Sequence, residues 1–198
     1  MLFRIRKAIP RRYWTYFIHG KIRMAKTIKQ ITISVIAATF LAAVLYRITA
    51  ASWLFSVAIT FGTAAYHFVM RLVTGGIVNA VMHNKADLSR RWYQISNREQ
   101  KFYRMIRVKK WKKNMPSYNP SFFDPGLHSW QEIAQAMCQS EITHEIICIF
   151  SFIPLIFTVW FGAFPVFLIT SLLAALIDLL FVIMQRYNRP RIMRLIHS

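Results

Sequence analysis

Three ionisable side chains and a thiol lie at helical spacing in the second half of the chain: Glu141, His144, Glu145 and Cys148. Spacings of three and four residues place them within an arc of roughly 100° on one helix face. A carboxylate, Glu141 or Glu145, is expected to orient His144, whose imidazole can then act as general base on a hydroxyl group or as a proton relay. The simpler alternative is that all four are interfacial residues flanking an apolar helix.

Asp178 and His67 interrupt two other apolar segments. Asp178 lies eight residues before Arg186, which is about 12 Å along a regular helix, and its short side chain cannot reach out of the apolar region. His67 lies one helical turn before Arg71 and is the expected partner of Asp178. This pair could belong to an active site, or it could only join two helices at about 1 kcal/mol.

The chain closes with an arginine-rich motif, Gln-Arg-Tyr-Asn-Arg-Pro-Arg. Guanidinium groups bind phosphate through forked donors. The candidate phosphate ligands in the motif are Arg186, Asn188, Arg189 and Arg191. Pro190 is expected to end the helix, so that these groups can turn back toward the site. The alternative is that the arginines only anchor the last helix at the membrane surface.

A second basic run contains Lys109, Lys110 and Trp111. It either attracts anionic lipid, at roughly 1 kcal/mol per cation near the surface, or guides a polyanionic substrate such as a coenzyme A thioester. The sequence has no P-loop, nucleophile elbow, His-Glu-x-x-His or Rossmann glycine pattern. Only one histidine lies within residues 141–148, so we expect neither a bound metal nor a resident cofactor.

Long apolar helices must position these residues. The chain has 198 residues, 56% of them hydrophobic, and a net charge of +19. Its charges fall in blocks between long uncharged runs, which is typical of membrane proteins and argues against nucleic-acid binding. Runs near the required length of about 20 apolar residues predict four transmembrane helices, over residues 31–46, 49–70, 142–161 and 165–184.

The connections within the first and second pairs of helices are so short that each pair is expected to form a tight hairpin. The sequence therefore predicts an all-α membrane protein with four transmembrane helices in two hairpins and an amphipathic, interfacial cytoplasmic region between them. The predicted segments are a basic N-terminal segment (1–30), the first hairpin (31–70), the basic amphipathic region (71–141), the second hairpin (142–184) and a basic tail (185–198).

The distribution of Lys and Arg predicts the orientation. Nine precede the first span, twelve lie within residues 71–113 and four follow the last span, whereas the two connections hold one and none. The positive-inside rule then places both termini and the central region in the cytoplasm.

The central region is expected to contain an amphipathic helix or helix pair on the membrane surface. Apolar residues recur at spacings of three or four from Leu88 to Ile106, with a polar gap at Glu99, and Asp87 is a candidate cap. A second helix is expected to start at residues 129–132, a capping box. It would run into the third span and kink at Pro154.

Three stretches, residues 102–112, 136–145 and 185–191, resemble the glycosyl-4,4'-diaponeurosporenoate acyltransferase family of bacterial membrane proteins. The closing motif is the most specific of them, and the resemblance covers roughly residues 100–198. It implies transfer of a fatty acyl chain from an activated donor, expected to be acyl-CoA, to a hydroxyl group of a glycosylated carotenoid or another glycolipid.

The resemblance also implies a location and partners. The location is the bacterial plasma membrane, and the partners are membrane lipids, a glycolipid-like acceptor and the acyl donor. In this scheme His144 deprotonates the acceptor hydroxyl, with Glu141, Glu145 and Asp178 as the other catalytic candidates, and His67 and the two basic groups bind substrate. The alternative is a non-catalytic accessory or lipid-binding scaffold protein, in which these polar residues only hold helices together.

Overall fold

The computed structural model describes residues 11–116 and 120–196, and their regular elements are all helical. Four helices are long and apolar enough to cross a membrane, over residues 25–49, 52–82, 130–161 and 164–196. The prediction of an all-α protein with four such helices is therefore confirmed. The long helices are α1 (Arg11–Thr49), α2 (Ser52–Met82), α5 (Trp130–Phe150) and α7 (Phe164–Ile196).

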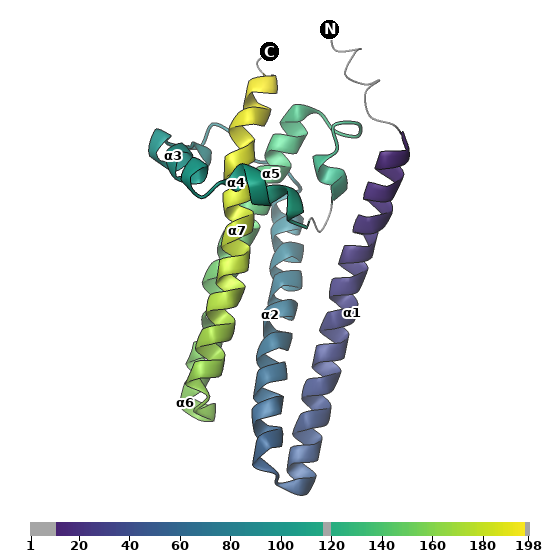
Figure 1. Cartoon of the computed structure of the whole chain (residues 1–198), viewed down its shortest axis with the longest axis vertical. Coiled ribbons are helices and arrows are strands. Elements are labelled where there is room, and N and C mark those ends of the chain that lie inside the picture. The colour runs from purple at the N-terminus through teal and green to yellow at the C-terminus, as the bar shows by residue number, and fades with distance from the viewer. Residues whose placement is uncertain (1–10, 117–119, 197–198) are drawn as a thin grey trace.

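The four long helices form two packed pairs. α1 packs on α2, α5 packs on α7, and α2 joins the two pairs through contacts to both α5 and α7. α1 begins and α7 ends at the same end of the bundle, which we call the terminal end, and two short helices contact α7 near that end (Figure 1). These are α3 (Asn97–Met105) and α4 (Val108–Trp111).

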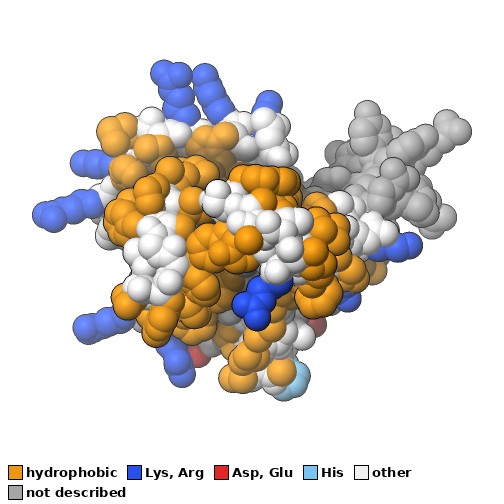
Figure 2. Space-filling model, turned by 90° about the horizontal axis from the view of Figure 1, so that it is seen from below, with side chains coloured by type: hydrophobic (Ala, Val, Ile, Leu, Met, Phe, Trp, Pro, Cys, Tyr) orange, Lys and Arg blue, Asp and Glu red, His pale blue; other side chains and the backbone are white. Residues whose placement is uncertain are grey.

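The surfaces of the long helices are apolar away from the terminal end. Large side chains such as Phe40, Ile48 and Val159 are more than 70% exposed. Extended apolar surface of this kind is rare in soluble monomeric proteins. The view from the end opposite the termini shows hydrophobic side chains over much of the near face, with a Lys or Arg side chain near its middle and others projecting around the edge (Figure 2). This distribution suits helices surrounded by lipid.

The start of α5 follows from its capping box, as predicted. The Ser129 hydroxyl accepts a hydrogen bond from the backbone N–H of Glu132 (3.3 Å), and the Glu132 carboxylate accepts from the backbone N–H of Ser129 (2.7 Å). Two otherwise unpaired backbone donors at the helix start are thereby satisfied.

Pro154 interrupts the third spanning segment, also as predicted. α5 ends at Phe150, and a 3-10 segment, Ile153–Phe157, leads into the short α6 (Thr158–Phe161). Proline has no N–H to donate to the carbonyl of Phe150. The Tyr66 hydroxyl on α2 donates to that carbonyl instead, at 2.8 Å, so the break costs no unsatisfied acceptor.

The central region forms the second of the two expected arrangements, a pair of short helices rather than one amphipathic helix. A 3-10 turn, Arg91–Tyr93, precedes α3, and Arg107 adopts a left-handed conformation (φ 53°) that separates α3 from α4. Ser96, not Asp87, caps α3 by accepting from the N–H of Glu99. The Asp87 carboxylate accepts from Ser89 within a turn.

Pro190 does not end the last helix, which continues to Ile196. A proline within a helix removes one backbone hydrogen bond. The preceding turn is anchored to α5 by ion pairs from Arg186 and Arg189, and the helix continues beyond the proline. α2 likewise continues past the expected end of its span, so Arg71 lies inside a helix.

We expect Ser129→Ala to lower the free energy of unfolding by about 1 kcal/mol, because the capping hydroxyl is lost. Thermal unfolding of the purified protein, followed by circular dichroism in detergent, measures the change. Ser171→Ala is the control, since the Ser171 hydroxyl is buried without a hydrogen-bond partner among the described residues and its removal should not destabilise the fold. An equal loss in both variants would contradict the capping role.

Candidate active site

Asp178 is the centre of a buried polar cluster that joins three helices. Its side chain on α7 is 2% exposed. One carboxylate oxygen lies 2.8 Å from Nδ1 of His144 on α5. The other accepts from Arg71 on α2, through Nε at 3.0 Å and through Nη2. We call these three residues the Asp178 cluster.

Arg71 is fixed by more than its carboxylate partner. Nη1 donates to the backbone carbonyl of His67 at 3.2 Å, and Nη2 donates to the carbonyl of Ala174 at 3.1 Å. The guanidinium therefore compensates the charge of Asp178 and also ties α2 to α7. Arg71 directly follows the span expected from hydropathy, residues 49–70, so its role could not be predicted from the sequence.

The His144 ring is held in a defined orientation. Because the Asp178 carboxylate accepts at Nδ1, that nitrogen carries the proton and Nε2 is left as an acceptor. The ring stacks on Phe181, with centroids 4.6 Å apart and planes 8° from parallel. No hydrogen bond to Nε2 is formed by residues 11–116 or 120–196, and the side chain is 21% exposed. A carboxylate-oriented imidazole with an open nitrogen is the arrangement of a general base.

The predicted pairing of His67 with Asp178 is wrong. His144 and Arg71 occupy both oxygens of Asp178, because Arg71 lies one turn further along α2 and its long side chain reaches the carboxylate. His67 is 5% exposed, and both of its ring nitrogens lack a hydrogen-bond partner among the described residues.

A second buried cluster surrounds Glu141, whose side chain has no exposed surface. Its two carboxylate oxygens accept from Arg186, at 2.5 Å, and from Arg189. Arg186 also forms a forked ion pair with Glu99, at 2.5 Å from Nε and 3.1 Å from Nη2. Arg189 donates to the carbonyl of Tyr93 at 2.6 and 3.1 Å. We call Glu141, Arg186, Arg189 and Glu99 the Glu141 cluster.

The Glu141 cluster ties the central region to the spanning helices. Arg186 and Arg189 have internal partners, which account for their positions without a phosphate ligand. Neither Glu141 nor Glu145 orients His144, contrary to the expectation from spacing. Glu145 instead accepts from the indole of Trp92 at 2.9 Å.

In the sequence, Glu99 only interrupts the apolar pattern of the central region. In the structure it forms an ion pair with Arg186. Burial raises the pKa of Glu99, but hydrogen bonds from Arg186 and Tyr103 outweigh burial and leave the pKa below its ordinary value. Burial, together with the hydrogen bond to Glu99, raises the pKa of Tyr103. The carboxylate is therefore ionised and the phenol neutral at physiological pH.

The other predicted binding residues lie around α4 and the end of α7. Asn188 accepts from Lys112, and Arg191 lies over the ring of Tyr187 at 4.1 Å from its centroid. Lys109, Lys110 and Arg191 line one pocket between α4 and α7. Trp111 does not line it. Its indole donates to the carbonyl of Ile106 at 3.2 Å.

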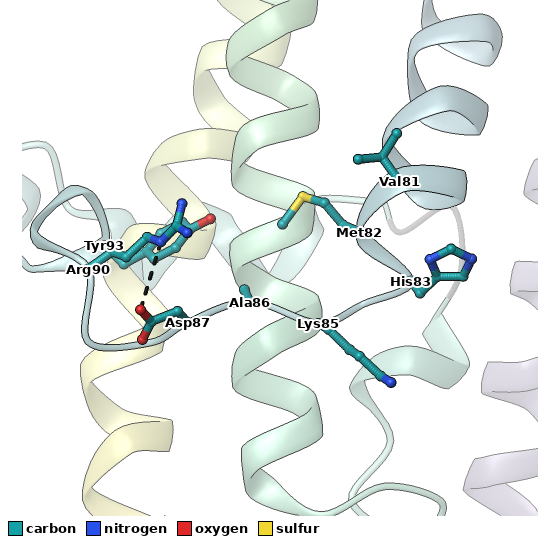
Figure 3. Close-up of a pocket in the computed structure, with 8 residues that line it drawn as sticks. All are labelled: Val81, Met82, His83, Lys85, Ala86, Asp87, Arg90 and Tyr93. Carbon is teal, nitrogen blue, oxygen red and sulfur yellow. Dashed lines mark ion pairs between the residues drawn. The ribbon is translucent and has the colours of Figure 1, made fainter.

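A different pocket, of about 410 Å³, lies beyond the end of α2. Asp87 and Arg90 form an exposed ion pair at its edge, at 3.8 Å. His83 and Lys85 point away from that pair (Figure 3). The lining side chains do not converge on one point, so this pocket has no arrangement that suits catalysis.

The fold and the two clusters define a membrane protein with four spanning helices and a buried carboxylate–histidine pair. A sequence model of the glycosyl-4,4'-diaponeurosporenoate acyltransferase family matches residues 89–198, which include α3 to α7. The chain belongs to this family, and the family implies an acyltransferase of carotenoid biosynthesis. Comparisons with curated proteins and with solved structures gave no match.

We expect Glu141→Gln to lower the free energy of unfolding by about 3 kcal/mol, because Arg189 would lose its buried countercharge and Arg186 would lose one of its two. Chemical unfolding in detergent micelles measures this change. Glu145→Gln is the matched control one turn along α5, because glutamine can still accept from the Trp92 indole. If the two variants were equally stable, the Glu141 cluster would not hold the fold together.

The ion pair of Glu99 predicts a pH dependence of stability. Its folded pKa lies below its ordinary value of 4.5, so its stabilising contribution is complete above that value and is lost as pH falls through the folded pKa. The stability difference between the wild type and Glu99→Gln should therefore be constant near neutral pH and shrink below about pH 4.5. Thermal unfolding at a series of pH values measures it. A difference that stayed the same at acid pH would show that the charge of Glu99 contributes nothing.

Proposed function

We propose that this chain transfers a fatty acyl group from an activated donor, expected to be acyl-CoA, to a hydroxyl group of a glycosylated carotenoid or a related glycolipid. The observation that carries the proposal is the hydrogen bond between His144 Nδ1 and Asp178, 2.8 Å long, with Nε2 left open. Family membership supports the reaction class.

In the proposed reaction, Nε2 of His144 takes the proton of the acceptor hydroxyl as its oxygen attacks the thioester carbonyl. A C–O bond forms, the C–S bond breaks, and the leaving thiolate takes the proton back from the imidazolium. Asp178 stabilises the imidazolium while it exists. Arg71 keeps the Asp178 carboxylate in place, so we assign Arg71 a positioning role.

The remaining predicted residues divide between support and binding. Glu141 and Glu145 form no hydrogen bond or ion pair with His144 and are not needed as proton carriers in this scheme. His67 interacts electrostatically with Arg71 and Asp178 and is only 5% exposed, so we assign it a supporting role beside the Asp178 cluster. Arg186, Asn188 and Arg189 support the fold around the site.

The donor is assigned to the pocket lined by Lys109, Lys110 and Arg191.

We further propose that the terminal end of the bundle faces the cytoplasm of a bacterial cell. Lys and Arg are concentrated in the segments that meet at this end, as the positive-inside rule requires. Acyl-CoA is a cytoplasmic donor, so this orientation brings the donor to the same end as the Asp178 and Glu141 clusters.

We expect His144→Gln to reduce ester formation at least about 100-fold, because general base catalysis contributes that much or more. Purified protein in lipid nanodiscs would be supplied with acyl-CoA and the glycosylated carotenoid, and the ester quantified by mass spectrometry. Glutamine can still bond to Asp178, so the fold should be kept.

His128→Gln is the matched control, because His128 lies in the loop before α5, outside the Asp178 cluster. Its activity should equal that of the wild type. Equal ester formation by His144→Gln would exclude the proposed base. The absence of any ester from well-folded wild-type protein would favour the alternative of a non-catalytic scaffold protein.

A further inference from the structure

A pocket of about 500 Å³ lies between α3, α4 and the last turns of α7, and we call it the basic pocket. Seven of its lining residues are cationic and none is acidic. The cationic residues are Arg104, Arg107, Lys109, Lys110, Arg186, Arg191 and Arg194. Such a concentration of one charge on the wall of a single pocket attracts anions.

Asp and Glu side chains leave most of the cations of this pocket without an ion-pair partner. All seven Asp and Glu residues lie in the described part of the sequence. Among the cations that line the pocket, only Arg186 forms an ion pair with any of them, namely with Glu99 and Glu141. The other six therefore have no Asp or Glu partner.

The walls of the pocket are built on buried residues. Val108 is completely buried and Tyr103 is 4% exposed, so both α3 and α4 are anchored beneath the basic side chains. Arg191 lies over the Tyr187 ring and donates to its hydroxyl at 2.7 Å, which restricts the position of its guanidinium. The guanidinium of Arg191 is therefore partly preorganised before any ligand binds.

Lys112, a cation beside the pocket, gives a second sign of crowded positive charge. Burial lowers the pKa of Lys112, which lies over the same Tyr187 ring, and the charges of Arg191 and Lys109 lower it further. These cations are close enough to destabilise one another. An anion bound among them would relieve the repulsion.

The basic pocket is also connected to the proposed catalytic base. Arg186 belongs to its wall and donates to Glu141, which lies three residues before His144 on α5. Along α7, Arg186 and Asp178 are eight residues apart, or about 12 Å. The wall of the basic pocket and Asp178 are therefore about two helical turns apart along α7.

We propose that the basic pocket binds phosphate groups, and that these belong to the phosphorylated carrier of the acyl donor. This assignment rests on the proposed function for the identity of the donor. Phosphate is favoured over a single carboxylate because six cations without Asp or Glu partners can compensate several negative charges, and because arginine forks match phosphate oxygens. An anionic lipid headgroup offers the same chemistry.

The test uses the full-length protein in phosphatidylcholine nanodiscs, with coenzyme A as the probe and isothermal titration calorimetry as the readout. Lys109→Gln/Arg191→Gln should weaken coenzyme A binding at least about tenfold, because charge-assisted hydrogen bonds are lost. Pantetheine, which lacks the phosphates, should not compete with coenzyme A.

The matched control is Arg98→Gln/Lys113→Gln, which removes the same two residue types from exposed positions outside the pocket. It should change the affinity less than about twofold. Equal weakening by both double variants, or by neither, would overturn the phosphate site, with circular dichroism confirming that each variant is folded.

A second arm separates the two sources of phosphate. If the pocket binds a lipid headgroup, phosphatidylglycerol should co-purify with the wild type and the control but not with Lys109→Gln/Arg191→Gln, and coenzyme A should not bind. That result supports a phosphate site but assigns it to lipid. If neither probe depends on Lys109 and Arg191, the proposal fails.

The binding test is independent of catalysis. His144→Gln should bind coenzyme A with the affinity of the wild type, even where it forms no ester. Wild-type protein that binds coenzyme A in the pocket but forms no ester would refute the proposed function and leave the phosphate site standing. Ester formation with unchanged KM for acyl-CoA in Lys109→Gln/Arg191→Gln would refute only the phosphate site.

Discussion

The carboxylate of Glu141 has no exposed surface, so its charge must be compensated within the protein. Two guanidinium groups, from Arg186 and Arg189, supply that compensation. Because both belong to α7 while Glu141 belongs to α5, the requirement fixes the rotation of one helix against the other. The same arginines also hold carbonyl groups of residues 92–94. The position of the central region thus follows from one buried charge.

The Asp178 cluster depends on this arrangement. Asp178 lies about two turns before Arg186 on the same helix, and His144 lies one turn after Glu141 on α5. Once Glu141 and Arg186 set the register of α5 and α7, His144 and Asp178 face one another. Arg71 then adds α2 to the pair. The Glu141 cluster fixes how the helices pack, and the neighbouring Asp178 cluster contains an imidazole nitrogen without a hydrogen-bond partner among the described residues.

The parts of the structure that depend on local chemistry were predictable from the sequence. Apolar run length predicted the four spanning helices, and the capping box predicted the start of α5. The pairing of charges was not predictable, because it depends on contacts between distant residues. Arg71 and Asp178 are 107 positions apart, and Glu99 and Arg186 are 87 apart. The spacing of Glu141, His144 and Glu145 indicated a shared face but could not show which partner each would take.

The stacking of His144 on Phe181 restricts how a substrate can reach the base. The lone pair of Nε2 lies in the plane of the imidazole, and that plane runs nearly parallel to the phenyl ring of Phe181. One face of the imidazole is covered, so an approach from that face is closed. A hydroxyl that gives its proton to Nε2 must therefore arrive edge-on. The packing of this aromatic pair thus leaves the edge of the imidazole as the route to Nε2.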